Sequence, residues 1–281
     1  MTAHQVQLSE STVKYWEYSE KHQPTIVMVH GFRGDHHGLE YIARALPKFR
    51  VIIPDLPGFG ASTAFSDRTH DIAGYATFLQ EFISALKLPT PPVLLGHSFG
   101  SIVAAEYAAK YPQTIQKLIL INAIAAPPLQ GPKAVLSRLT SAYYWVGGAL
   151  PDKAGRALLG NKQIILAMSM VLAKSRDKTI RAKVHRNHLA YFGSFANRRV
   201  VLEAFKASTS SFIGSKQAHQ ITVPTLLIAG ELDDIAPVKQ QKKLEASLPD
   251  ARLMVVTGVG HLVHYEAPEK AAAAISEFIN G

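Results

Sequence analysis

The pentapeptide Gly-His-Ser-Phe-Gly at 96–100 constrains this chain more than any other stretch. It follows an apolar run at 92–95 and precedes a run of small, helix-forming residues at 102–109. A serine at the apex of a sharp strand-to-helix turn is what the G-x-S-x-G pattern describes, with the hydroxyl lifted toward a cleft. The glycines near Ser98 let the strand and the helix pass close together. Because so short a pattern also occurs by chance, a catalytic interpretation needs a base and an acid elsewhere in the chain.

Short apolar runs alternate with helix-like segments along most of the chain. Buried strands are predicted at 25–29, 51–53, 92–95, 117–122, 224–229 and 252–256, with weaker edge strands within 5–18. Helices are predicted at 39–46, 72–86, 238–248 and 268–279. This alternation indicates an α/β fold with a mostly parallel, doubly wound sheet. The loops after the strands should then converge on one site beyond the carboxyl edge of the sheet.

The strand pattern stops at Pro127-Pro128 and returns near residue 220. Helical patterns fill the interval, at 133–146, 153–159, 161–174, 177–192 and 197–213. We therefore expect a core domain made of residues 1–127 and 220–281. Residues 128–219 are expected to form a helical cap inserted into that core.

The predicted cap carries most of the positive charge. Between Pro128 and His219 there are 15 Lys and Arg against 3 Asp and Glu, whereas the rest of the chain has 15 against 18. A basic segment can bind nucleic acid, but no interleaving of basic and aromatic residues accompanies this one, so we expect no nucleic-acid partner. Two interpretations of this basic segment are left. It forms a solvated basic face, or it forms a surface that attracts anionic substrates or lipid headgroups.

The chain contains no cysteine, which excludes disulfides, thiol catalysis and thiolate metal sites and fits a cytoplasmic protein. The first residues lack the cationic and apolar regions of a secretion signal. The longest apolar run, 164–173, is too short to span a bilayer, so no integral membrane segment is expected. We expect a monomer or a homodimer.

Two late loops supply candidates for the base and the acid. The loop 230–237 contains Asp233 and Asp234, and the loop 258–268 contains His261. A serine hydroxyl is a poor nucleophile unless a base accepts its proton and a third group orients that base. His261 would take the proton of Ser98, and Asp233 would hold the other ring nitrogen. The spacing from Gly230 favours Asp233, with Asp234 as the competing acid.

Five pieces of the sequence, in this order, resemble the α/β-hydrolase fold family, in its serine-nucleophile branch with a helical cap. The pieces are His30-Gly31, Asp55-x-x-Gly58-x-Gly60-x-Ser62, Gly96-x-Ser98-x-Gly100, Gly230-x-x-Asp233-x-x-x-Pro237, and Gly260-His261 followed by Glu266-x-Pro268. The resemblance extends over nearly the whole chain and implies no cofactor. It also implies an oxyanion hole made by the backbone N–H groups of Phe32 and Phe99.

Other polar and aromatic residues have weaker assignments. His30 from the core, with Tyr144, His188 and Phe192 from the cap, are the candidates for substrate contacts. The pair His36-His37 suggests a metal, but the sequence offers no third ligand at suitable spacing, so no metal site is expected.

The type of nucleophile limits the reactions that the chain could catalyse. Within the resembled family, haloalkane dehalogenases and epoxide hydrolases use aspartate at the position of Ser98, and dienelactone hydrolases use cysteine. The main hypothesis is a carboxylesterase-like serine hydrolase that cleaves a small-molecule ester through an acyl-serine intermediate. The alternatives are a carbon–carbon bond hydrolase or lyase that acts on a small anionic metabolite, and a ligand-binding, receptor-like member of the fold.

Overall fold

The computed structural model describes residues 1–19, 23–127 and 134–281, the last range with side chains from Leu139 onward. The predicted start of the cap at 128 lies outside the described residues. Within the described part of the chain, no helix is both long and apolar enough to cross a membrane.

Eight strands form one sheet in the order β1-β2-β4-β3-β5-β6-β7-β8. The strands are β1 (Thr2–Gln7), β2 (Thr12–Tyr18), β3 (Thr25–Val29), β4 (Arg50–Pro54), β5 (Val93–His97), β6 (Lys117–Ile121), β7 (Thr225–Gly230) and β8 (Ala251–Val256). Strand β2 pairs antiparallel with both β1 and β4, and the remaining neighbours are parallel. The predicted α/β fold with a mostly parallel sheet is therefore confirmed.

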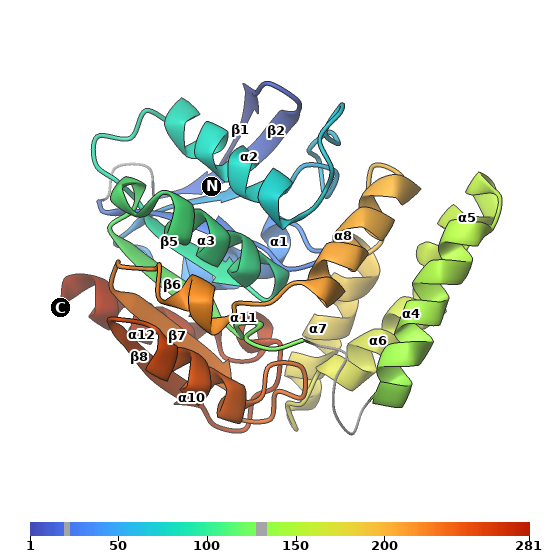
Figure 1. Cartoon of the computed structure of the whole chain (residues 1–281). Coiled ribbons are helices and arrows are strands. Elements are labelled where there is room, and N and C mark those ends of the chain that lie inside the picture. The colour runs from blue at the N-terminus through green and yellow to red at the C-terminus, as the bar shows by residue number, and fades with distance from the viewer. Residues whose placement is uncertain (20–22, 128–133) are drawn as a thin grey trace.

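Helices cover both faces of the sheet (Figure 1). They are α1 (His36–Arg44), α2 (Ile72–Ala85), α3 (Phe99–Lys110), α10 (Val238–Ser247), α11 (Val263–Glu266) and α12 (Pro268–Asn280), with a short 3-10 helix at Pro112–Thr114. Side chains alternate along each strand. Val27 and Val29 thus pack in the core that includes α2 and α3, whereas Ile26 and Met28 pack in the core that includes α1 and α12. The continuous apolar runs of the sequence follow from burial on both faces.

The chain between β6 and β7 is helical. It forms α4 (Ala134–Ala149), α5 (Asp152–Leu159), α6 (Lys162–Leu172), α7 (Lys178–Tyr191), α8 (Arg198–Ser210) and α9 (Ser215–Ala218), here called the helical insert. Figure 1 shows α4 to α8 gathered on one side of the sheet. The turn between α7 and α8 contacts the core, because Ala196 N donates to Gly58 O (2.8 Å) and Gly60 N donates to Ser194 O (3.3 Å).

Candidate active site

Ser98 occupies the sharp turn between β5 and α3. Its φ of 52° and ψ of −117° lie outside the regions that residues with a side chain normally adopt. The turn closes because its neighbours lack side chains. A Cβ atom at Gly96 would lie 2.3 Å from Gly100 O, and one at Gly100 would lie 2.4 Å from Val29 O. The sequence pattern therefore forms the expected elbow.

The structure brings three of the predicted residues into one hydrogen-bonded chain. His261 Nδ1 donates to Asp233 Oδ2 (2.8 Å), and His261 Nε2 accepts from the hydroxyl of Ser98 (2.8 Å). A carboxylate only accepts, so the hydrogen bond to Asp233 fixes the tautomer in which Nε2 is free to act as a base. Asp234, the competing acid, instead forms an ion pair with Lys174 (2.9 Å).

Asp233 is held by four donors. Its Oδ1 accepts from the backbone N–H groups of Ile235 (2.8 Å) and Ala236 (3.0 Å), and Oδ2 accepts from Asn122 Nδ2 (2.7 Å) as well as from His261. Burial alone raises the pKa of this carboxyl, but the charge of His261 and these hydrogen bonds outweigh it and lower the pKa to about 2. Asp233 therefore stays ionised near neutral pH.

Asn122 is a site residue that the sequence pattern missed. It directly follows β6, has a φ of 50°, and donates to Gly260 O (3.3 Å) in addition to Asp233. The available signal was its place at the carboxyl end of a predicted parallel strand, where chemistry gathers. The sequence has no carboxylate at position 122. The amide of Asn122 instead stabilises the carboxylate of Asp233, which lies in the loop after β7.

The predicted oxyanion donors belong to the residue after Ser98 and to a turn that packs against the elbow. Phe99 begins α3, and Phe32 lies in a turn in which Gly34 N donates to Gly31 O (3.0 Å). This turn abuts the elbow, since a Cβ atom at Gly31 would lie 3.5 Å from Ser98 Cβ. Among the described residues, none accepts a hydrogen bond from the N–H of Phe32 or Phe99. Neither N–H group is therefore used by an acceptor within the described part of the chain.

Three buried histidines support this arrangement in neutral form. His30 Nδ1 donates to Gly31 O (2.9 Å), and its Nε2 accepts from Leu56 N (2.9 Å). His97 Nε2 donates to the carbonyl of His261 (3.1 Å), and its ring packs on His264 at 4.0 Å. Burial, assisted by the charge of His261, lowers the pKa of His97 to about 3, and burial also lowers those of His30 and His264.

A cavity of about 550 Å³ opens above Ser98 and His261. Its walls are mainly apolar, and the insert contributes Ile164, Ala167, Met168, Val171, Leu172, Phe192 and Phe205. His188 also lines the cavity, and its Nδ1 shares a hydrogen bond with Ser169 Oγ (2.8 Å). Burial, with a smaller contribution from His185, lowers the pKa of His188 to about 4. His188 therefore presents a neutral ring to the cavity near neutral pH.

Tyr144 is placed differently from the other predicted substrate contacts. It is buried against Phe205, with ring centroids 3.9 Å apart, and its hydroxyl accepts from the guanidinium of Arg33 (3.2 Å). Tyr144 is not among the described residues that line the cavity, whereas His30, His188 and Phe192 are.

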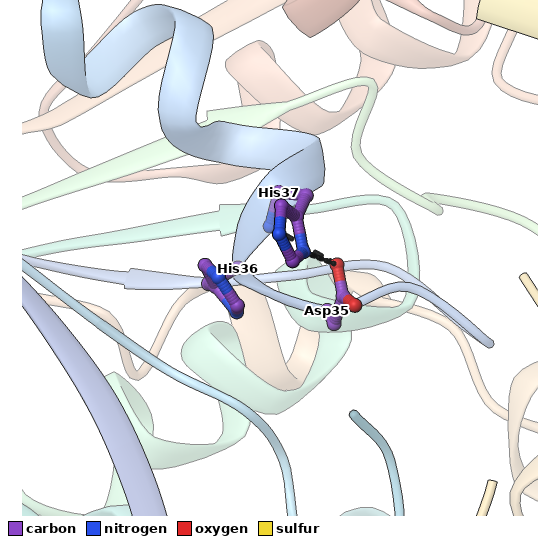
Figure 2. Close-up of side chains that lie close together, drawn as sticks. All are labelled: Asp35, His36 and His37. Atoms are coloured by element: carbon purple, nitrogen blue, oxygen red, sulfur yellow. Dashed lines mark hydrogen bonds and ion pairs between the residues drawn. The ribbon is translucent and has the colours of Figure 1, made fainter. Parts of the chain in front are cut away.

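The structure corrects one premise about His36 and His37. Asp35 supplies a carboxylate, and the candidate ligand atoms of the three residues lie within 4.8 Å of one another (Figure 2). Each side chain already has a partner, however. Asp35 caps α1 and accepts from His37 Nδ1 (3.1 Å), while His36 Nδ1 lies 2.9 Å from Asp55 Oδ1. Helix capping and ring stacking on Trp16 account for the cluster without a metal ion.

Comparison with known proteins identifies the family of this chain. A family model described as "alpha/beta hydrolase fold" matches residues 24–268. The chain belongs to the alpha/beta hydrolase fold family. Solved structures with a similar fold include an esterase from Exiguobacterium antarcticum, with a TM-score of 0.80, 20% identity and complete coverage of both chains. Another is a membrane phospholipase A, with a TM-score of 0.80 and 22% identity over 100% of this chain and 86% of the other.

Curated relatives in this alpha/beta hydrolase fold family carry lipase names. Lipase 1 of Psychrobacter immobilis is 26% identical over 254 residues, covering 88% of this chain and 74% of the relative. Monoacylglycerol lipase ABHD6 of Homo sapiens is 26% identical over 270 residues, covering 92% and 76%. These relatives support a hydrolase that acts on esters.

Proposed function

We propose that this protein is a serine hydrolase that cleaves carboxylic esters through an acyl-Ser98 intermediate. The observation that carries the proposal is the chain of 2.8 Å hydrogen bonds from Ser98 through His261 to Asp233, opening onto an apolar cavity. Nucleophile, base and orienting acid thus stand in the order that acyl transfer requires.

In the acylation step, Ser98 Oγ attacks the ester carbonyl carbon while His261 Nε2 accepts the hydroxyl proton. Asp233 remains ionised and stabilises the resulting imidazolium through Nδ1. The backbone N–H groups of Phe32 and Phe99 receive the negative charge of the tetrahedral intermediate, each contributing roughly 3–4 kcal/mol to its stabilisation. His261 then delivers its proton to the leaving alkoxide, and the acyl group stays on Ser98.

Deacylation repeats these roles with water as the nucleophile. His261 accepts a proton from water, the hydroxide adds to the acyl carbonyl, and the same two N–H groups hold the second oxyanion. Collapse of this intermediate releases the carboxylic acid, and the proton on His261 returns to Ser98. The cycle is balanced without a cofactor.

The helical insert acts in this proposal as a cap, with the core formed by residues 1–127 and 220–281 and the cap by 128–219. His188 and Phe192 would contact the substrate, because both line the cavity. The turn from Gly31 to Gly34, which contains Phe32, is here called the oxyanion turn. His30 and Tyr144 are better explained as supports of this turn, since their polar atoms form hydrogen bonds within the protein.

The charges around the cavity favour a neutral substrate over the small anionic metabolite of the alternative hypothesis. Among the described lining residues, the permanently cationic side chains are Arg33 and Lys174. Arg33 is fully buried and Lys174 pairs with Asp234, so neither offers its charge to an anion. An apolar acyl group fits the walls contributed by α6.

The test combines turnover with covalent labelling. We expect hydrolysis of p-nitrophenyl esters from acetate to decanoate, and single-site labelling by a fluorophosphonate that peptide mass spectrometry places on Ser98. Ser98→Ala should abolish both signals, and Ser84→Ala, on an exposed part of α2, should change neither. Full turnover by Ser98→Ala would refute the mechanism. Labelling without ester turnover, or preferred cleavage of anionic dienoic acids, would favour the alternative hypotheses.

A further inference from the structure

Arg33 stands in a backbone conformation that arginine does not favour. It is the third residue of the turn from Gly31 to Gly34, and its φ is 58°. A positive φ at this position defines a type II turn, where glycine or asparagine is the usual residue. The turn would form more readily with glycine, so the backbone does not explain the arginine. Its side chain has to provide the reason.

That side chain is fully buried and joins three separate parts of the helical insert. Nε donates to the carbonyl of Phe192 at the end of α7 (3.0 Å), and one terminal nitrogen donates to the carbonyl of Leu159 at the end of α5 (2.6 Å). The other terminal nitrogen donates to the hydroxyl of Tyr144 in α4 (3.2 Å). The guanidinium carbon lies 4.7 Å from the centroid of the Phe192 ring. Only a planar guanidinium offers donors in all these directions at once.

The guanidinium is not a receptor for a substrate carboxylate. It is fully buried, and each of its three nitrogens already donates to a protein oxygen. Its described hydrogen-bond partners are carbonyl and hydroxyl oxygens of the protein, and no described carboxylate lies within ion-pair distance of it. A buried charge without a carboxylate is uncommon in proteins. Its contacts point to a mechanical role between two parts of the fold.

We propose that Arg33 is a positioning residue that fastens the oxyanion turn to the helical insert, so that the insert must be closed for the oxyanion hole to be complete. Phe32 is the residue before Arg33, and its N–H is the donor that the proposed mechanism uses. One side of the turn rests on the elbow through Gly31, and Arg33 anchors the other side to α4, α5 and α7. This inference rests on the proposed function, because it assumes that an oxyanion forms beside Ser98.

The experiment compares Arg33→Gly, Arg33→Met and Arg33→Lys with the wild-type protein. Arg33→Gly is the sharpest variant, because glycine suits the positive φ and keeps the turn while it removes the anchor. Arg198→Met is the matched control. Arg198 also donates to carbonyls at the end of α4, those of Gly147 and Leu150, but it has no contact with the oxyanion turn.

Four quantities are measured: kcat and KM for p-nitrophenyl butyrate, the affinity of a trifluoromethyl ketone, and the affinity of a secondary alcohol of the same shape. The ketone adds to Ser98 and forms an oxyanion, whereas the alcohol only fills the cavity. We expect Arg33→Gly and Arg33→Met to lower kcat and ketone affinity by about 10²-fold, the loss typical of one oxyanion donor. KM and alcohol affinity should stay within threefold, and Arg33→Lys should recover part of the loss.

Arg198→Met should lower the thermal midpoint and leave kcat within threefold. A kcat of Arg33→Gly within threefold of wild type would overturn the proposal. So would an equal loss of ketone and alcohol affinity, because that result assigns Arg33 to cavity shape alone. Failure of the proposed function is a separate observation, made on the wild-type protein, which would then neither hydrolyse the ester nor bind the ketone covalently.

Discussion

Exchange of Asp233 for asparagine has an outcome that the structure specifies atom by atom. Oδ1 of Asp233 accepts from the backbone N–H groups of Ile235 and Ala236, and these donors are fixed by the loop. The amide oxygen of the variant must take that position. Its NH2 group then takes the place of Oδ2 and faces His261 and the amide of Asn122, which in wild type both donate to that carboxylate oxygen.

The change reverses the ring tautomer of His261. Nδ1 must accept from the new amide, so the ring proton moves to Nε2, which then donates to Ser98 instead of accepting from it. A positioned general base contributes roughly 10²–10⁴-fold to the rate, and each tenfold corresponds to about 1.36 kcal/mol of activation free energy. We expect kcat of Asp233→Asn to fall about 10³-fold, or about 4 kcal/mol, with KM changed less than threefold.

The assay is steady-state hydrolysis of p-nitrophenyl butyrate, with circular dichroism and thermal unfolding to verify the fold. Asp234→Asn is the matched variant, because it removes the neighbouring carboxylate, which pairs with Lys174 and not with His261. It should lose less than tenfold in kcat. A larger loss for Asp234→Asn than for Asp233→Asn would refute the assignment of the acid, and an unchanged kcat in Asp233→Asn would refute the tautomer argument.

Three further predictions follow from packing and charge. Gly100→Ala should lower the midpoint of thermal unfolding by several degrees and reduce kcat, because the added Cβ would lie 2.4 Å from Val29 O; an unchanged midpoint would contradict this contact. Met168→Trp, in the cavity wall, should lower kcat/KM for decanoate at least tenfold more than for acetate, and equal losses would show that the acyl chain lies elsewhere. The pKa of Asp233 is lowered from 3.8 to about 2, so its contribution is complete above pH 5 and is lost as the pH falls toward 2. Urea unfolding should show a loss of about 2 kcal/mol over this range, and a similar loss in Asp233→Asn would assign it to other groups.

Local patterns predicted the scaffold because they record burial directly. In β3, residues 26–29 are apolar at successive positions because both faces of the strand are covered, and this holds whatever the neighbouring strands are. The order of Ser98, Asp233 and His261 was informative because each follows a predicted parallel strand, and the carboxyl ends of such strands share one edge. The helices of the insert were likewise visible as periodic segments, whereas the short α9 and α11 are single turns without a periodic signal.

The contacts that complete the candidate site join distant parts of the chain. Asn122 and Asp233 are 111 positions apart, and Arg33 and Phe192 are 159 positions apart. No local pattern distinguishes an asparagine that will meet a carboxylate from one that caps a turn. Nor does the sequence show that Tyr144 will face Arg33 instead of the cavity, because a buried tyrosine in a helix has the same periodicity in either case.

The sequence by itself determined the elbow at Ser98, the sheet and the late loops, because steric requirements and burial act on neighbouring residues. The spacing from Gly230 favoured Asp233 as the acid, but only the tertiary structure showed that Asp233 meets His261 while Asp234 pairs with Lys174, and that Arg33 ties the oxyanion turn to the insert. The physical reason is that a hydrogen bond forms only when the side chain points toward its partner and the two atoms lie at the right distance to within a fraction of an ångström. Those directions are set by the packing of the insert on the core, which no short stretch of the chain contains.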